Sequence, residues 1–122
     1  MCTPSCLDWG KRNLTEEEVR GKRVIEVGSY DVNGSLRSIV ESLGSAEYIG
    51  ADIRNGPGVD VMCPAENLAE RFGKGSFDIV ISTCTLEHIR DWKLAISNIK
   101  NVKITGSYHK FLGLTRIGDN MA

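Results

Sequence analysis

The chain has 122 residues, of which 41% are hydrophobic and 25% charged, and 15 basic against 16 acidic residues give a formal net charge of −1. This composition is typical of one globular domain and excludes an intrinsically disordered chain. The near-neutral charge offers no long-range field to nucleic acid or anionic lipid, and no apolar run approaches the roughly 20 residues that a membrane span needs.

The opening segment, MCTPSCLDWGKRN, lacks the charged start and apolar core of a secretory signal peptide. The four cysteines form no C-x-x-C pair of the kind that binds zinc. We therefore expect no metal site, free thiols and a cytoplasmic protein.

The first predicted elements are a short helix, a strand and a longer helix. Residues 15–18, TEEE, have the spacing of a capping box and predict a lead-in helix within residues 1–22 that ends at Gly21. RVIEV, at 23–27, is a β-branched run and predicts a strand. Apolar residues spaced i, i+3, i+4 and i+7 over 36–43 predict a helix that ends at Gly44.

The following segments continue this alternation. EYIGAD at 47–52 and VDVMC at 59–63 predict two further strands, and apolar residues over 65–72 have helical spacing again. FDIVIS at 77–82 is the most apolar run, as expected for the central strand of a parallel sheet. Asp91 is a good N-cap for a helix that reaches residue 102. In the atypical tail, 103–122, YHKFLGLT is a candidate fifth strand.

Strands that alternate with helices predict βαβ units with right-handed crossovers. The expected fold is α/β and Rossmann-like: a doubly wound, mostly parallel sheet with helices on both faces, whose core is residues 23–102. Ligands of such folds lie at the carboxyl ends of the strands, where the strand order reverses. The loops GSYDVNGS at 28–35 and STCTLEH at 82–88 are therefore the candidate binding loops.

The first loop does not have the sequence of a phosphate-binding loop. The dinucleotide fingerprint is G-x-G-x-x-G, and here Gly28 is present but Tyr30 replaces the second glycine. Asp31 adds a carboxylate where phosphate oxygens would have to lie, which is electrostatically unfavourable. A Walker A loop is excluded because no Gly-Lys-Ser/Thr follows. A dinucleotide is therefore disfavoured.

S-adenosylmethionine has the opposite requirements, since it carries a sulfonium and an ammonium group and no phosphate. Glu26 and Asp31 could offer negative charge to its cationic end, while backbone amides of the loop could meet its carboxylate. Asp52, at the end of the second strand, is the kind of acid that accepts two ribose hydroxyls. Asp52 alone does not discriminate, because NAD presents the same diol, but the combination favours S-adenosylmethionine.

Residues 23–102 resemble the class I S-adenosylmethionine-dependent methyltransferases of the small type 11 group. VIEVGSYDVNGS resembles the first motif of that family, YIGADI the second, and FDIVISTCTLEHIRD the region of the fourth strand. The resemblance implies that Glu26, Gly28 and the following loop hold the methionine part, that Asp52 holds the ribose, and that Ile53 contacts the adenine. It also implies that Ser82 and Thr83 close the pocket.

One position departs from the family. Its members commonly have an aspartate before the Ala-Glu pair that follows the third strand, where this chain has Pro64. Adenine recognition there would fall to the backbone, to Glu66, or to neither. The candidate cofactor-binding residues are Glu26, Gly28, Ser29, Tyr30, Asp31, Asn33, Gly34, Asp52, Ile53, Cys63, Ser82 and Thr83.

The resemblance implies transfer of a methyl group from S-adenosylmethionine to an unidentified small acceptor. No residue stands out as a general base: we expect His88 to be structural and Trp92 to lie in the core. Because the sequence lacks the family's strands after the fifth, the alternative is a non-catalytic S-adenosylmethionine-binding module or a truncated paralogue. An exposed sheet edge would then favour a homodimer, and no nucleic acid or membrane partner is indicated.

Overall fold

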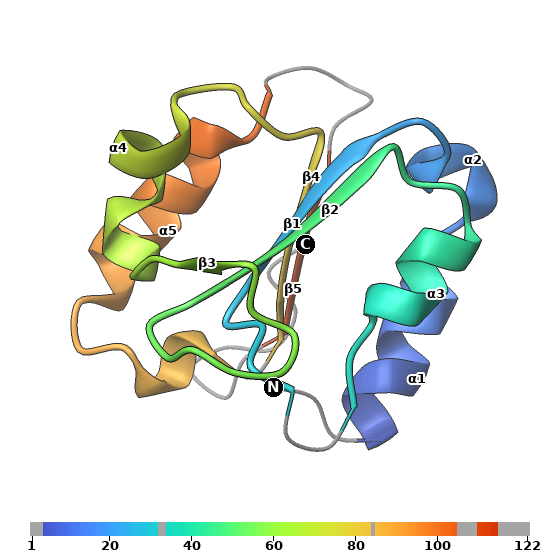
Figure 1. Ribbon diagram of the computed structural model, residues 1–122, viewed down its shortest axis with the longest axis horizontal. Helices are drawn as coiled ribbons and strands as arrows, with labels where there is room; N and C mark the ends of the chain where they lie inside the picture. Colours follow the sequence, from blue (N-terminus) through green and yellow to red (C-terminus); the bar gives the residue numbers. More distant parts are fainter. Residues whose placement is uncertain (1–3, 32–33, 84, 105–109, 115–122) are drawn as a thin grey trace.

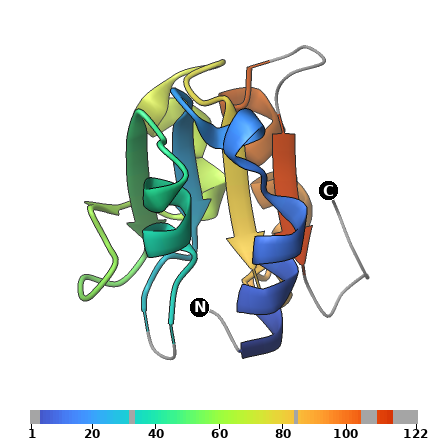
Figure 2. The ribbon, with the colours of Figure 1, turned by 90° about the vertical axis from the view of Figure 1, so that its right-hand side faces the viewer.

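The computed structural model describes residues 4–31, 34–83, 85–104 and 110–114. Within them, five parallel strands form one sheet in the order β3-β2-β1-β4-β5, with helices on both faces (Figures 1 and 2). The strands are β1 Arg23–Val27, β2 Glu47–Asp52, β3 Val61–Met62, β4 Ile79–Thr83 and β5 Lys110–Leu114. The predicted doubly wound α/β fold is confirmed.

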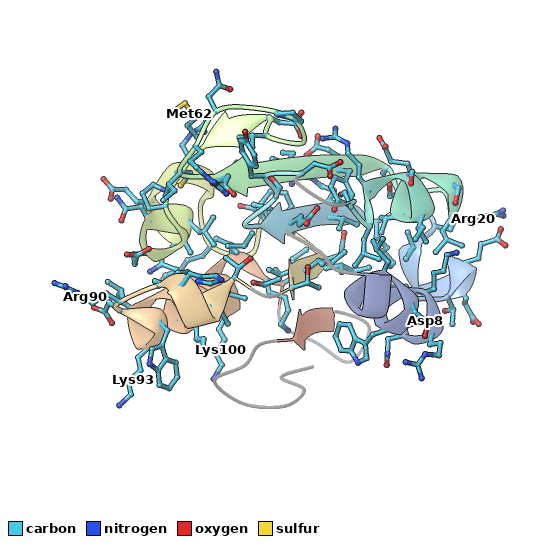
Figure 3. All side chains as sticks on the ribbon, turned by 90° about the horizontal axis from the view of Figure 1, so that it is seen from below. Asp8, Arg20, Met62, Arg90, Lys93 and Lys100 are labelled. Carbon is cyan, nitrogen blue, oxygen red and sulfur yellow. The ribbon has the colours of Figure 1, made fainter. Side chains whose placement is uncertain are left out.

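The strand order reverses beside β1, at the centre of the sheet. Its neighbour on one side is β2, in a register that pairs Val27 with Ala51, and on the other side it is β4, in a register that pairs Glu26 with Ile81. The chain therefore leaves β1 and β4 in opposite directions across the sheet, which opens a crevice at their carboxyl ends. Figure 3 is viewed onto this edge of the sheet.

Helices cover the sheet in two layers, as Figure 1 shows. One layer contains α1 Pro4–Asn13, α2 Glu16–Val19 and α3 Arg37–Ser42, and the other contains η1 Ala65–Asn67, α4 Leu68–Phe72 and α5 Trp92–Val102. The short turn η2, Leu86–His88, connects β4 to α5. In the described residues, no helix combines the length and apolarity required to cross a membrane.

Each layer has its own apolar cluster against the sheet. The α4 and α5 side contains, among others, Ile25, Leu68, Phe77, Val80, Ile99 and Val102. The α1 to α3 side contains Leu14, Val19, Val24, Leu36, Val40, Tyr48, Ile79 and Ile81. Alternate residues of β1 and β4 thus enter opposite clusters, as the period-two geometry of a buried strand requires.

Several local predictions are confirmed by hydrogen bonds at helix starts. The Glu18 backbone N–H donates to Thr15 Oγ1 at 3.2 Å, and the Glu18 carboxylate accepts from the Thr15 backbone N–H at 3.2 Å, which completes the capping box of α2. Asp91 caps α5, because its Oδ1 accepts from the Leu94 N–H at 3.1 Å.

Two elements differ from the sequence prediction. Helix α1 precedes the single lead-in helix that the sequence predicted; its Gly10 lies so close to α3 that a Cβ there would be 2.4 Å from Leu36 Cδ2. The third strand was predicted over 59–63 but consists of Val61–Met62 alone. The reason is Asp60, whose carboxylate accepts from the Gly50 N–H at 2.8 Å and from Arg37 at 2.7 Å, so that a side chain takes the place of a ladder bond.

Candidate functional site

A cavity of about 620 Å³ opens at the carboxyl ends of the strands. Its walls come from four segments: the end of β1 with Gly28, the residues after β2, the residues after β3, and the connection from β4 to α5. Ligand sites of small molecules occupy about 300–1,000 Å³, and in doubly wound folds they lie at this position. The cavity is therefore the candidate binding site.

Gly28 forms the floor of the cavity beside Thr85. Its φ of +80° is left-handed, and its N–H donates to the Ala51 carbonyl at 2.8 Å. A Cβ at this position would lie 2.2 Å from Thr85 Oγ1, which itself donates to the Thr83 carbonyl at 3.0 Å. Both the backbone conformation and this close approach require glycine.

Asp52 presents an oriented carboxylate to the cavity. The residue is 8% exposed; its Oδ2 accepts from the Tyr30 N–H at 3.1 Å and its Oδ1 from the Arg54 N–H at 2.9 Å. Each carboxylate oxygen has two acceptor positions, so each retains capacity for a ligand hydroxyl. The arrangement suits a pair of donors such as a ribose diol.

Next to Asp52 the cavity wall is apolar. Ile53 is 67% exposed although its side chain is a large hydrocarbon, and Pro64 and Ala65 lie in the same cavity wall. Cys63 is buried, its Sγ donates to the Pro64 carbonyl at 3.3 Å, and burial raises the pKa of its thiol. An uncharged thiol keeps this wall apolar, which suits the face of a planar aromatic ring.

Within residues 28–31, the backbone N–H groups of the first loop donate to other groups of the protein. Those of Gly28 and Ser29 donate to the Ala51 carbonyl at 2.8 and 3.1 Å, that of Tyr30 to Asp52, and that of Asp31 to the Pro57 carbonyl at 2.8 Å. A pyrophosphate would need free N–H groups at this loop. The hydrogen bonds therefore support the prediction that a dinucleotide is disfavoured.

Asp31 and Gly34 line a second cavity, of about 950 Å³, between α1, α3 and the first loop. Asp31 Oδ1 accepts from the Gly34 N–H at 2.9 Å, so that the carboxylate closes the turn of the loop. Asn33 lies outside the described residues.

Glu26 lies in the layer of α3, apart from the first cavity. It is 2% exposed, and its Oε1 accepts from the Tyr48 hydroxyl and from Ser35 Oγ, the latter at 3.3 Å. Burial raises the pKa of Glu26 above its ordinary value. The pKa of Tyr48 is also raised, mainly by burial and to a smaller extent by the nearby charge of Glu26.

The remaining predicted residues lie near the cavity but do not line it. Ser29, Ser82 and Thr83 are buried, and the hydroxyls of Ser29 and Ser82 have no hydrogen-bond partner within the described part of the chain. The Tyr30 ring packs under the Arg54 guanidinium, whose Cζ lies 4.1 Å from the ring centroid. Of the predicted residues, the cavity brings together Gly28, Asp52, Ile53 and Cys63.

Sequence reasoning missed several side chains of the cavity. Arg54 and Thr85 were not predicted, and His88 was expected to be structural but is exposed and lines the cavity. The available signal was their position directly after a strand that ends at the reversal. Trp92 is half-buried, with Lys93 Nζ 5.7 Å from its ring centroid, instead of lying in the core. In Figure 3 the labelled Arg90 extends away from the sheet.

The described residues contain no group of three or more histidine, cysteine, aspartate or glutamate side chains able to hold a metal ion.

Comparison with known proteins identifies the family. A family model described as a methyltransferase domain matches residues 25–109. No curated protein matches the sequence.

Solved structures share the fold. An S-adenosylmethionine-dependent methyltransferase from Mesorhizobium loti is 20% identical with a TM-score of 0.69, and the match covers 89% of this chain and 52% of that one. A putative S-adenosylmethionine-dependent methyltransferase from Listeria monocytogenes is 16% identical with a TM-score of 0.67, covering 88% and 51%. The trans-methyltransferase CalH, solved in complex with SAH, is 15% identical with a TM-score of 0.57, covering 88% and 37%.

The chain spans about half the length of the first two of these structures. At such identities the likeness is one of fold, whereas the family model covers most of the sequence and includes the strands and loops that form the cavity. The chain belongs to the methyltransferase domain family.

Proposed function

We propose that this chain binds S-adenosylmethionine and that the protein transfers the methyl group to a small acceptor. The observation that carries the proposal is the cavity at the strand reversal, where the oriented carboxylate of Asp52 lies beside the exposed, apolar Ile53. Family membership supports the same ligand, since the related structures are described as S-adenosylmethionine-dependent enzymes.

The residues of the cavity fit the nucleoside half of this ligand. Asp52 would accept from the ribose hydroxyls, Ile53 would pack on one face of the adenine, and Pro64 and Ala65 would form the apolar wall around it. Glu66 lines the same cavity, and its carboxylate would accept from the adenine amino group. It lies two residues after Pro64, the position at which the family commonly has an aspartate.

The first loop would hold the methionine half of the ligand. Gly28 connects the cavity to this loop, and Asp31 and Gly34 line the neighbouring cavity. Glu26 supplies negative charge from beneath the loop when it is ionised, and Ser35 Oγ lies 3.3 Å from it. Asn33, Ser29, Tyr30, Ser82 and Thr83 complete the proposed surroundings of the ligand.

The sulfonium supplies an activated methyl group when it is bound, so the protein's own contribution is positioning and exclusion of water. Gly28 and Thr85 determine how closely a ligand approaches β1, and the apolar wall excludes water from the nucleoside. An acceptor that must lose a proton would need a base, and His88 presents an exposed imidazole in the cavity wall.

Calorimetry with S-adenosylhomocysteine tests the binding step. We expect a dissociation constant in roughly the micromolar range, and Asp52→Ala should weaken binding at least about tenfold, because two hydrogen bonds to a charged acceptor are lost. The control is Glu17→Ala, which removes an exposed carboxylate from α2, far from the cavity. Equal binding by wild type and Asp52→Ala, or no binding by either, contradicts the proposal.

Turnover is tested separately, by release of S-adenosylhomocysteine from S-adenosylmethionine with mixed small acceptors. Product release supports the transferase. Binding without product release supports the alternative, a non-catalytic module.

We further propose that the protein acts in the cytoplasm, that nucleic acid is not its substrate, and that a second copy covers the outer edge of β5. The free thiol of Cys63 suits a reducing compartment, and β5 pairs only with β4 in the described residues. Light scattering tests the second copy, the location of a tagged copy tests the compartment, and the turnover assay with DNA or RNA as the acceptor tests whether nucleic acid is a substrate. A monomer, a secreted protein or methylated nucleic acid contradicts the corresponding point.

A further inference from the structure

The Arg54 side chain, in the loop after β2, packs against the ring of Tyr30, in the first loop. The guanidinium Cζ lies 4.1 Å from the centroid of the Tyr30 ring, which is the shortest of the cation–π distances found among the described residues. The stack joins two segments that are separate in the sequence, the loop after β1 and the loop after β2.

The same two residues hold the Asp52 carboxylate. Tyr30 donates its backbone N–H to Oδ2 at 3.1 Å, and Arg54 donates its own to Oδ1 at 2.9 Å. Arg54 Nε lies 3.7 Å from Oδ1 and adds positive charge on that side. Each oxygen is thus held by one of the two loops, and the stacked side chains fix the distance between the two donors.

The packing around Tyr30 leaves little freedom for another arrangement. A Cβ on Gly56, in the loop after β2, would lie 2.4 Å from Tyr30 Cε2. The absence of a side chain at Gly56 therefore leaves room for the ring beside its Cε2 edge. Tyr30 occupies the position of the second glycine in the dinucleotide fingerprint, so this chain uses a side chain where the fingerprint has none.

We propose that Tyr30 and Arg54 are positioning residues that clamp the Asp52 carboxylate and thereby make the cavity selective for nucleosides with an intact ribose diol. The inference rests on the proposed function, because it assumes that Asp52 meets the ribose. A carboxylate held at both oxygens accepts two hydroxyls in one fixed geometry, whereas a carboxylate that can rotate accepts either hydroxyl alone almost as well.

The experiment compares S-adenosylhomocysteine with its 2′-deoxy analogue by calorimetry and uses the ratio of the two dissociation constants. We expect wild type to prefer the intact diol by about tenfold, the size of one hydrogen bond to a charged group. Arg54→Gln and Tyr30→Leu should each lower this ratio roughly two- to fivefold, the size of an exposed cation–π contact. A general loss of loop stability would weaken both ligands and leave the ratio unchanged.

Three further variants separate positioning from other effects. Tyr30→Phe retains the ring and should recover the selectivity that Tyr30→Leu loses. Gly56→Ala should lower the ratio because it displaces the ring, although Gly56 is not part of the cavity wall. Arg23→Gln is the matched control. Arg23 also lies over an aromatic ring, that of Phe77 at 5.1 Å, and pairs with a carboxylate, that of Glu47 at 3.2 Å. Its side chain is 49% exposed, close to the 51% of Arg54, but it starts β1 at the opposite edge of the sheet.

The outcomes distinguish this inference from the proposed function. If neither nucleoside binds to wild type, both are overturned. If wild type prefers the diol and Arg54→Gln and Tyr30→Leu keep the full preference, only the inference is overturned. If wild type binds both nucleosides equally, Asp52 does not discriminate the intact diol from the 2′-deoxy ribose, and the inference is again overturned. A ratio that falls in these variants and stays at its wild-type value in Arg23→Gln supports it.

Discussion

Glu26 shows how one residue can serve the loop without facing the cavity. It occupies the acidic position of the first motif, but its carboxylate lies under α3 and accepts from Tyr48 and Ser35. Because burial raises its pKa, the folded state holds the Glu26 proton more tightly than the unfolded chain does. Ionised Glu26 therefore costs stability at neutral pH, which is reasonable for a charge kept for a cationic ligand.

This gives a prediction for Glu26→Gln. Wild type should lose stability as the pH rises from the ordinary glutamate pKa of 4.5 through the raised folded value, while the glutamine variant, which cannot ionise, should not. The difference in free energy of unfolding, variant minus wild type, should rise with pH by at most about 1.4 kcal/mol per pH unit in that window. Urea unfolding at a series of pH values measures it, and a difference that is flat or falls with pH contradicts this interpretation.

The sequence identified those cavity residues whose place follows from their position at the end of one strand. Gly28, Asp52, Ile53 and Cys63 each end or follow a strand near the reversal, and the structure brings them to one cavity. Arg54 and Thr85 also follow strands at this edge, but their contacts with Tyr30 and Gly28 on other segments could not be predicted from the sequence. Side-chain direction within a loop depends on such tertiary contacts and has no periodic signal.

Among the elements, α4 depends on its neighbour more than on its own sequence. It is short, begins as the 3₁₀ turn η1, and has no side-chain cap of its own. Its Ala69 N–H donates to Oδ1 of Asn98, a residue of α5 that is 8% exposed, at 3.0 Å. One helix is thus capped by another across the layer.

Asn98→Ala should lower the free energy of unfolding by about 1 kcal/mol, because it leaves the half-buried Ala69 N–H at the start of α4 without its acceptor. Chemical denaturation measures the change. Asn101→Ala, an exposed asparagine of the same helix, is the control and should change stability by less than about 0.5 kcal/mol. Equal effects of the two substitutions contradict the capping role.

Elements with strong local signals could be predicted and those stabilised by packing could not. The strands β1, β2 and β4 and the caps of α2 and α5 agree with the sequence patterns. Helix α1 has a glycine within it, and its apolar Leu7 and Trp9 pack on the cluster beneath α3, a contact with no counterpart in local sequence.

At the scale of the whole molecule, the order of the strands explains where the site lies. The reversal beside β1 brings the ends of β1, β2 and β4 together, so that residues from distant parts of the chain share one cavity. The alternation of strands and helices predicted this reversal. It did not predict the hydrogen bonds that tie the first loop to Ala51 and Asp52 of β2 and to Pro57 in the loop after β2.

The central claim is that this cavity holds the nucleoside half of S-adenosylmethionine, with Asp52 on the ribose and Ile53 on the adenine. A crystal structure of the protein grown with S-adenosylhomocysteine tests it most directly. We expect both ribose hydroxyls within hydrogen-bonding distance of the Asp52 carboxylate, at about 2.5–3.0 Å, and the adenine against Ile53. Electron density for the nucleoside in the second cavity, beside Asp31 and Gly34, or an empty first cavity at saturating ligand would contradict it.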